Sequence, residues 1–179
     1  MKVAVVGATG LVGRNMLKVL QERKFPVTEL IPVASEKSAG LKVEFNGKEY
    51  TVCTPEQAIE KKPSIAIFSA GSDASAVWAP KFAQNGCYVV DNSAYWRMDP
   101  TKKLVIPEIN GNVIEKGDYI IANPNCSTIQ SIIPLKALDD KYGLTRVVYT
   151  TYQSVSGSGM KGLKDLENTL QGQPNEFYP

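Results

Sequence analysis

A glycine-rich segment, GATGLVG at residues 7–13, lies between a mostly apolar run and a helical pattern near the start of the chain. Residues 2–6 have the character of a buried strand, and apolar residues recur at helical spacing from Leu11 to Leu20. At such a junction glycines let the backbone approach a pyrophosphate, and the N-terminus of the helix offers free N–H groups to it. The segment therefore predicts a dinucleotide-binding turn. The alternative is a tight turn that merely needs glycine.

Strand and helix patterns alternate along the rest of the sequence. Asn46-Gly47 predicts a hairpin of residues 42–45 and 49–52, and Thr54 to Gln57 has the residue types of a capped helix start. The other predicted strands are residues 30–34, 64–69, 88–90, 119–122 and 146–152, and the helices are 55–61, 73–83 capped by Asp73, 127–142 containing Pro134, and a last one containing Leu163, Leu166 and Leu170. This order predicts an α/β fold with a Rossmann-type, doubly wound, mainly parallel sheet.

We place a domain boundary at residue 125. Residues 1–125 form the first domain, and residues 126–179 are the first part of a second domain. The ligand crevice of such a sheet lies at the carboxyl ends of its strands, and polar loops follow several of the predicted strands.

Composition narrows the class of protein. The formal charge is +2 with acids and bases interspersed, and no apolar run approaches the length of a membrane helix. We therefore expect a small-molecule ligand, with no nucleic acid and no membrane as partner. Three cysteines without a CxxC pair suggest neither a disulfide framework nor a metal site, and a reducing cytoplasm is expected.

The segment ASEKSAG, residues 34–40, follows the second predicted strand. In Rossmann-type folds the residues at this position determine whether NAD or NADP binds. Ser35, Lys37 and Ser38 suit a 2′-phosphate, which favours NADP(H) as the cofactor. Glu36 would suit the ribose diol of NAD if the loop register differed by one residue. If residues 34–40 are only a solvated loop, this segment does not distinguish NAD from NADP.

The segment NPNCST places Cys126 after a strand and at the start of a helix, where N–H groups and the helix dipole favour a thiolate. Cys126 is therefore the candidate nucleophile, whereas Cys53 and Cys87 lie in strand patterns and are expected to be buried. The sequence contains no His, so the usual Cys–His pairing is absent from it.

Two further polar residues follow strands. Arg97 could bind an anionic substrate group through two hydrogen bonds, or it could be a surface arginine that packs on Trp96. The side-chain amide of Gln153 could orient a carbonyl or carboxylate, or be an ordinary polar strand end.

Taken together, GATGLVG, ASEKSAG, FSAG, DNSAYWRMD, IPE, ANPNCSTIQ and TTYQSVSG resemble the bacterial aspartate-semialdehyde dehydrogenases, in order and spacing, along essentially all 179 residues. NPNCST is the most specific of these motifs, because the similar N-acetylglutamyl-phosphate reductases typically have NPGCY there.

The resemblance implies NADPH-dependent reductive dephosphorylation of L-aspartyl 4-phosphate to L-aspartate 4-semialdehyde, a step toward lysine (through diaminopimelate), threonine and methionine. It implies a thioester on Cys126, a phosphate held by Arg97 and Asn125, an acyl group oriented by Gln153, and a homodimer or homotetramer at full length. The residues implied to hold the cofactor are Gly7, Thr9, Gly10, Leu11, Val12, Gly13, Ser35, Lys37, Ser38, Ser156 and Gly157.

This sequence departs from the family in length, because members are roughly twice as long and carry a proton-shuttling His and a substrate-binding Arg in the missing part. The resemblance thus implies a truncated chain, with a cofactor domain and only the first part of an α+β catalytic and dimerisation domain, that is inactive alone. Two alternatives stay open: an N-acetylglutamyl-phosphate reductase-like enzyme and a non-catalytic NADP(H)-binding regulatory module.

Overall fold

The structure is a computed structural model that describes residues 1–174. The chain divides into two compact units, Met1–Pro124 and the segment that begins at Asn125. The first unit contains two sheets with their helices, and the described part of the second contains two α-helices and a short 3₁₀ helix.

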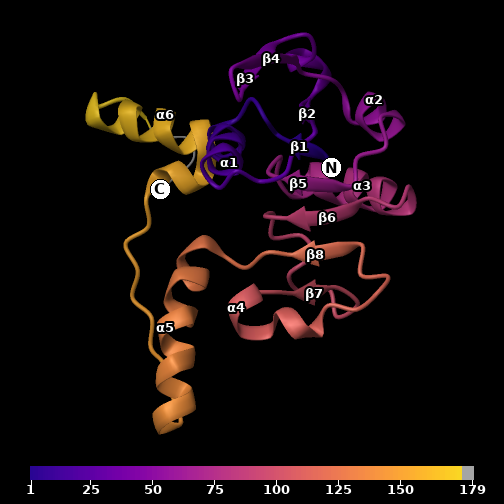
Figure 1. The fold of residues 1–179 in the computed structure, drawn as a ribbon. Coiled ribbons are helices and arrows are strands. Elements are labelled where there is room, and N and C mark those ends of the chain that lie inside the picture. Colours follow the sequence, from indigo (N-terminus) through magenta and orange to yellow (C-terminus); the bar gives the residue numbers. More distant parts are fainter. Residues whose placement is uncertain (175–179) are drawn as a thin grey trace. The chain divides into compact units, whose positions relative to one another are not determined.

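The first unit is built on a six-stranded sheet in which every neighbouring pair of strands is parallel (Figure 1). In spatial order its strands are β2 (Glu29–Val33), β1 (Lys2–Val6), β5 (Ile65–Phe68), β6 (Tyr88–Asp91), β8 (Ile120–Ala122) and β7 (Lys103–Leu104). The chain winds outward from β1 in both directions, as in doubly wound folds. The predicted Rossmann-type architecture is confirmed.

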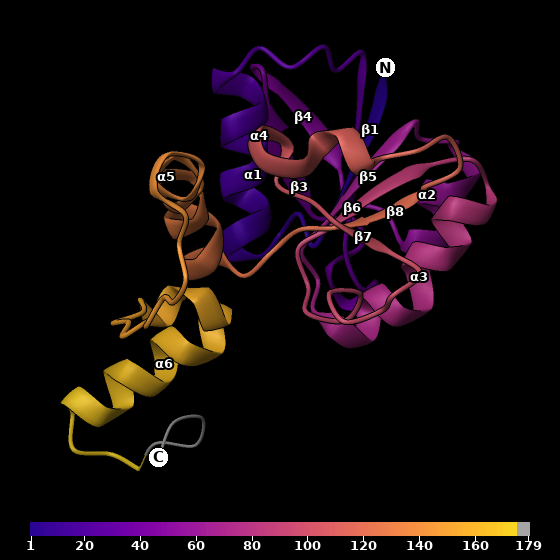
Figure 2. The ribbon, with the colours of Figure 1, turned by 90° about the horizontal axis from the view of Figure 1, so that it is seen from below.

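Helices cover both faces of this sheet. Figure 2 shows α1 (Leu11–Glu22) on one side and α2 (Pro55–Glu60) and α3 (Ser72–Gln84) on the other. The pleat of β1 divides its side chains between the two layers, because successive residues point to opposite faces. Val3 and Val5 lie in one buried cluster with Leu17 of α1, whereas the cluster on the other face contains Ala4, Val6 and Phe82 of α3.

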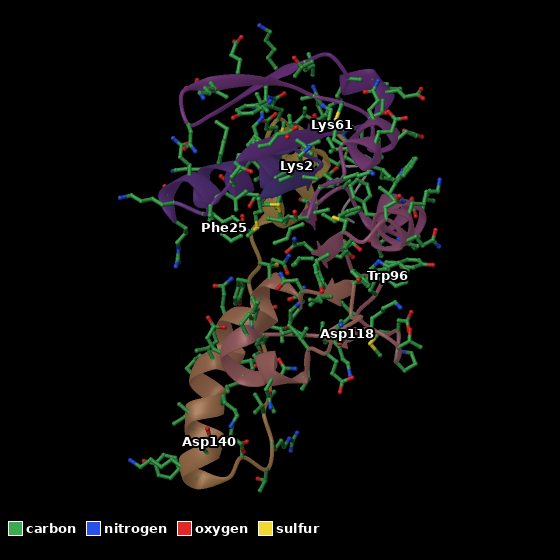
Figure 3. The ribbon with its side chains drawn as sticks, turned by 45° about the vertical axis from the view of Figure 1, so that its right-hand side comes forward. Lys2, Phe25, Lys61, Trp96, Asp118 and Asp140 are labelled. Carbon is green, nitrogen blue, oxygen red and sulfur yellow. The ribbon has the colours of Figure 1, made fainter. Side chains whose placement is uncertain are left out.

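Two local signals in the sequence are confirmed. Strands β3 (Lys42–Phe45) and β4 (Lys48–Thr51) pair antiparallel around Asn46 and Gly47, whose φ angles of 50° and 71° are those that a tight hairpin turn requires. Helix α2 begins with a capping box, in which Thr54 Oγ1 accepts from Gln57 N–H at 3.4 Å and Gln57 Oε1 accepts from Thr54 N–H at 3.1 Å. The end of α2 is tied to β1, because Lys2 Nζ donates to the Lys61 carbonyl at 3.1 Å (Figure 3).

Other predictions in the first unit need correction. Helix α3 begins at Ser72 after an N-cap at Gly71, so Asp73 lies in the first turn and is not the cap. Gly71 has φ of 88°, a backbone conformation that glycine adopts readily, and the N-cap is two residues earlier than the side-chain pattern indicates. Strand β7 and the short helix α4 (Pro107–Asn110), which continues as a 3₁₀ turn at Gly111–Val113, were not predicted.

The second unit contains α5 (Cys126–Tyr142), a 3₁₀ helix at Val155–Ser158 and α6 (Gly159–Leu170). Helix α5 starts one residue before the predicted position and continues through Pro134. The strand predicted at residues 146–152 is wrong: up to residue 174, this unit contains no strand with which the segment could pair. Its side chains are exposed, Val148 at 73% and Tyr152 at 100%. A β-branched, apolar segment without a partner strand has nowhere to place its backbone hydrogen bonds except water.

The packing of Gly13 against the first turn gives a test of the fold. A Cβ at Gly13 would lie 2.1 Å from the Gly7 carbonyl oxygen, so Gly13→Ala should lower the free energy of unfolding by about 1–3 kcal/mol. Gly111→Ala is the matched control, because its Cβ would have only Pro107 Cβ within 4 Å, at 3.8 Å. Urea unfolding followed by circular dichroism measures both. Equal stability of the two variants would contradict the close packing of this turn.

Candidate functional site

A cleft of about 390 Å³ lies at the carboxyl ends of β1, β2 and β5. It is lined by the residues Val6, Gly7, Thr9, Gly10, Ala34, Ser35, Pro55, Ser69, Ala70, Ala74 and Trp78. These come from the glycine-rich turn, the loops after β2 and β5, and the helices α2 and α3. The cleft is therefore in the position where open parallel sheets bind ligands.

The glycines of the turn are required by close backbone contacts. Gly7 has φ of 90°, and its N–H donates to the Val33 carbonyl at 2.8 Å. A Cβ at Gly7 would lie 2.5 Å from the Ser69 carbonyl oxygen. The turn therefore holds the ends of β1, β2 and β5 together, which no residue with a side chain at position 7 would allow.

The same turn fits a dinucleotide pyrophosphate. Gly10 is the N-cap of α1 and no side chain caps this helix. The N–H groups of Leu11 and Val12 have no acceptor anywhere in residues 1–174, so they remain available to an anion. Thr9 and Gly10 line the adjacent cleft. The predicted residues of the glycine-rich segment are thus brought together around one helix N-terminus.

The segment after β2 forms a short 3₁₀ helix, Glu36–Ser38, with Ser35 as its N-cap. The Ser38 N–H donates to the Ser35 carbonyl at 2.9 Å, which closes this turn. Of the predicted residues, Ser35 lines the cleft, whereas Lys37 and Ser38 lie beyond its lining. Lys37 and Glu36 are both exposed.

Arg97 is anchored by two backbone carbonyls. Its Nε donates to the Asn123 carbonyl at 3.0 Å and its Nη2 to the Asn92 carbonyl at 2.9 Å. Trp96 is nine-tenths buried and donates from Nε1 to Ser75 Oγ of α3 at 2.9 Å (labelled in Figure 3). Arg97 is thus held beside the ends of β6 and β8, while the neighbouring indole belongs to the core.

Residues 91–93 shape the loop that carries Arg97. The Asp91 carboxylate is fully buried and accepts from Ser93 Oγ at 2.5 Å and from Ser93 N–H at 3.2 Å. Ser93 Oγ in turn accepts from the Tyr95 N–H at 3.2 Å. The side chain of the last residue of β6 therefore folds the loop back on itself, which brings Arg97 toward the strand ends.

In the second unit, Asn125 and Cys126 begin α5. The Asn125 side-chain oxygen accepts from the N–H groups of Ser127 at 2.9 Å and Thr128 at 3.2 Å, so it caps the helix. Cys126 is the first helical residue and carries an exposed free thiol. A negative charge on this sulfur would lie at the positive end of a helix of 17 residues.

The other two cysteines are buried. Burial raises the pKa of Cys87 to about 12 and also raises the pKa of Cys53. Both raised pKa values keep these thiols protonated near neutral pH, and Cys126 is the exposed thiol among the three.

Gln153 is next to the start of α5, because its Oε1 accepts from Ser127 Oγ at 3.3 Å. Gly157 lies against the other end of the same amide: a Cβ there would be 2.8 Å from Gln153 Nε2. Ser156 is on the 3₁₀ turn just before Gly157, and its N–H donates to Ser154 Oγ at 3.4 Å. The structure thus brings Asn125, Cys126, Gln153 and Gly157 into one neighbourhood of the second unit.

Asn92 and Asn123, which hold Arg97, were given no role from the sequence. A signal for them existed, because each is a polar residue directly after a buried strand.

Within residues 1–174 no group of three or more His, Cys, Asp or Glu side chains could hold a metal ion. No helix in this range has the length and apolar character needed to cross a membrane.

Comparison with known proteins agrees with this geometry. The family model described as the semialdehyde dehydrogenase NAD-binding domain matches residues 2–117. An aspartate-semialdehyde dehydrogenase of Aquifex aeolicus is 55% identical over 174 residues, which cover 93% of this chain and 50% of the relative. An aspartate-semialdehyde dehydrogenase of Bacillus subtilis is 44% identical, and the aligned residues cover 97% of this chain and 50% of that relative.

A solved structure is similar along the same length. The crystal structure of aspartate semialdehyde dehydrogenase II from Vibrio cholerae, complexed with ASA, has a TM-score of 0.90 and 46% identity, covering 99% of this chain and 55% of that chain. The present chain spans about half the length of the curated relatives it matches. With the glycine turn, the parallel sheet and the matched residues in agreement, the chain belongs to the semialdehyde dehydrogenase family, and residues 2–117 are its NAD-binding domain.

Proposed function

We propose that the chain supplies the cofactor site and the nucleophile of an aspartate-semialdehyde dehydrogenase, which converts L-aspartyl 4-phosphate to L-aspartate 4-semialdehyde. The observation that carries this proposal is the exposed thiol of Cys126 at the capped start of α5. The relatives that share most of this chain carry the same enzyme name at 42–55% identity. The Vibrio cholerae enzyme of the same fold was solved with ASA.

In this proposal the Cys126 thiolate attacks the carbonyl carbon of the acyl phosphate, phosphate leaves, and a thioester forms on the sulfur. The capped N-terminus of α5 stabilises the thiolate, and Asn125 lies beside it. The Gln153 amide, held by Ser127, orients the acyl group. NADPH, when bound, supplies the hydride that reduces the acyl group to the aldehyde.

The N–H groups of Leu11 and Val12 would hold the pyrophosphate of the cofactor, at the turn that contains Gly7, Gly10 and Gly13. The 2′-phosphate is bound by Ser35, Lys37 and Ser38, which favours NADP(H) over NAD. Ser156 and Gly157, on the 3₁₀ turn Val155–Ser158, are assigned to the cofactor by the family resemblance alone. Arg97 binds the substrate phosphate, since part of its guanidinium has no acceptor within the described chain.

The same proposal assigns residues 1–125 to NADP(H) binding and residues from 126 onward to the first part of a catalytic and dimerisation domain. Support for the second assignment comes from α5, in which no residue is buried, although it carries Ile133 and Leu138. Apolar surface of this kind suits contact with further catalytic domain or with a second subunit in a homodimer. The three free cysteines fit a reducing cytoplasm.

The cysteine assignment predicts one reactive thiol in the native chain. At pH 8 one equivalent should react rapidly with Ellman's reagent, because Cys126 is exposed while Cys53 and Cys87 are buried and their pKa values are raised. Cys126→Ser should remove this phase, and the other two thiols should react only after unfolding in denaturant. Rapid reaction of a second thiol in native Cys126→Ser would contradict the assignment.

The cofactor assignment predicts a preference that depends on Lys37. NADPH should bind more tightly than NADH, and Lys37→Ala should weaken NADPH about 10-fold or more, the value of one charge-assisted hydrogen bond. Lys116→Ala is the matched control, since Lys116 is also exposed and precedes β8 at the opposite end of the sheet. Fluorescence titration measures each affinity. Equal binding of NADH and NADPH to the unaltered chain would favour Glu36 and the diol.

The reaction itself is tested by joining this chain to the remaining half of the Aquifex aeolicus relative. The chimera should oxidise aspartate semialdehyde with NADP⁺ and phosphate, and Cys126→Ala should lower kcat about 10⁴-fold or more. Cys87→Ala, a buried cysteine outside the site, should retain activity. A preference for N-acetylglutamate semialdehyde, or activity that survives Cys126→Ala, would overturn the proposal.

A further inference from the structure

The guanidinium of Arg97 has two pairs of parallel N–H groups, or forks, and the hydrogen bonds that hold this residue leave only one pair free. A carboxylate or phosphate can dock on two parallel N–H groups in two ways: side-on, across Nε and Nη2, or end-on, across Nη1 and Nη2. Nε has a single N–H, and it already donates to the Asn123 carbonyl at 3.0 Å. The side-on fork is therefore occupied.

The acceptors on that fork are fixed by a second layer of hydrogen bonds. Asn123 Nδ2 donates to Asn92 Oδ1 at 2.7 Å, which joins the two residues whose carbonyls accept from Arg97. Asn92 Nδ2 donates to the Phe68 carbonyl at 3.0 Å, and Asn92 N–H donates to the same oxygen at 3.1 Å. The amide of Asn92 thus links the last residue of β5 to the segment that follows β8.

The backbone continues the sheet through these two residues. Asn123 N–H donates to the Asp91 carbonyl at 2.8 Å, so both asparagines extend the hydrogen-bond ladder one residue beyond β6 and β8. Asn92, Arg97 and Asn123 are all partly buried. The carbonyls that accept from Arg97 consequently belong to residues that continue the sheet, while Arg97 lies in the loop after β6.

We infer that Asn92, with Asn123, is a positioning residue that holds Arg97 by its side-on fork, so that a phosphate docks end-on at Nη1 and Nη2. The docking part of this inference rests on the proposed function, in which Arg97 binds the substrate phosphate. A lysine could not replace Arg97 here, because one nitrogen cannot bind both carbonyls and still present two parallel N–H groups to the anion.

The positioning part is tested by NMR of the arginine side chains in the chain itself, assigned with the help of Arg97→Lys. In the unaltered chain the Arg97 Nε–H should exchange with water about 10-fold or more slowly than the Nε–H of exposed Arg23. Asn92→Ala should bring the two rates together. Asn85→Ala is the matched control, because Asn85 Nδ2 also donates to a backbone carbonyl, that of Lys81 at 2.8 Å, on α3.

Exchange in the unaltered chain as fast as that of Arg23 would overturn the positioning role, even if phosphate binds. This measurement does not depend on whether Asn92→Ala folds. Protection that persists in folded Asn92→Ala would also overturn it.

The docking part is tested by adding inorganic phosphate to the unaltered chain against sodium chloride at matched ionic strength. The expected result is a shift of the Nη resonances of Arg97 with its Nε–H still protected. Loss of that protection on adding phosphate would mean side-on docking and would overturn the inference. A protected Nε–H with no response at Nη would support the positioning role and refute the phosphate-binding role of Arg97 in the proposed function.

Discussion

The close approach of backbone segments at the first turn is the constraint on which the rest of this structure depends. Gly7 brings its N–H to Val33 and leaves no room for a side chain against Ser69, and Gly13 packs directly on Gly7. Three parallel strands and one helix meet at this point. Any widening of the turn would separate β2 from β1 and move the N-terminus of α1 away from the cleft.

The sequence was sufficient to predict those elements whose structure depends only on residues close together in the chain. The Asn46-Gly47 hairpin and the capping box at Thr54 form as predicted, because the turn and the cap each satisfy backbone groups within a few residues. Elements that need a distant partner were harder to predict. Residues 103–104 form a strand only because β8 lies beside them, and residues 146–152 have strand character but no partner in the described chain.

The candidate site also contains some residues whose positions follow from local sequence and others whose positions depend on distant parts of the chain. The position of Cys126 at the start of a helix could be predicted, because the strand and helix patterns on either side of it are local features. Asn125 was named only through the family resemblance, and its cap on α5 was not predicted. For Arg97 the sequence left two interpretations, and the structure shows Trp96 in the core and the guanidinium on two backbone carbonyls. A bond to a carbonyl carries no residue-type signature, since every residue has one. The sequence shows Asn92 and Asn123 only as polar residues after buried strands, and their bonds to Arg97 become visible once the strand ends are placed together.

The identity of the acceptors around Arg97 also sets the electrostatics of this edge of the sheet. Both oxygens that fix the guanidinium are neutral carbonyls, so its positive charge is not compensated by them. Had a carboxylate held the arginine instead, an incoming anion would have met a neutral pair and would have had to compete with it. Carbonyls, moreover, do not titrate. The arginine is thus held in one orientation by two acceptors that neither titrate nor neutralise its charge.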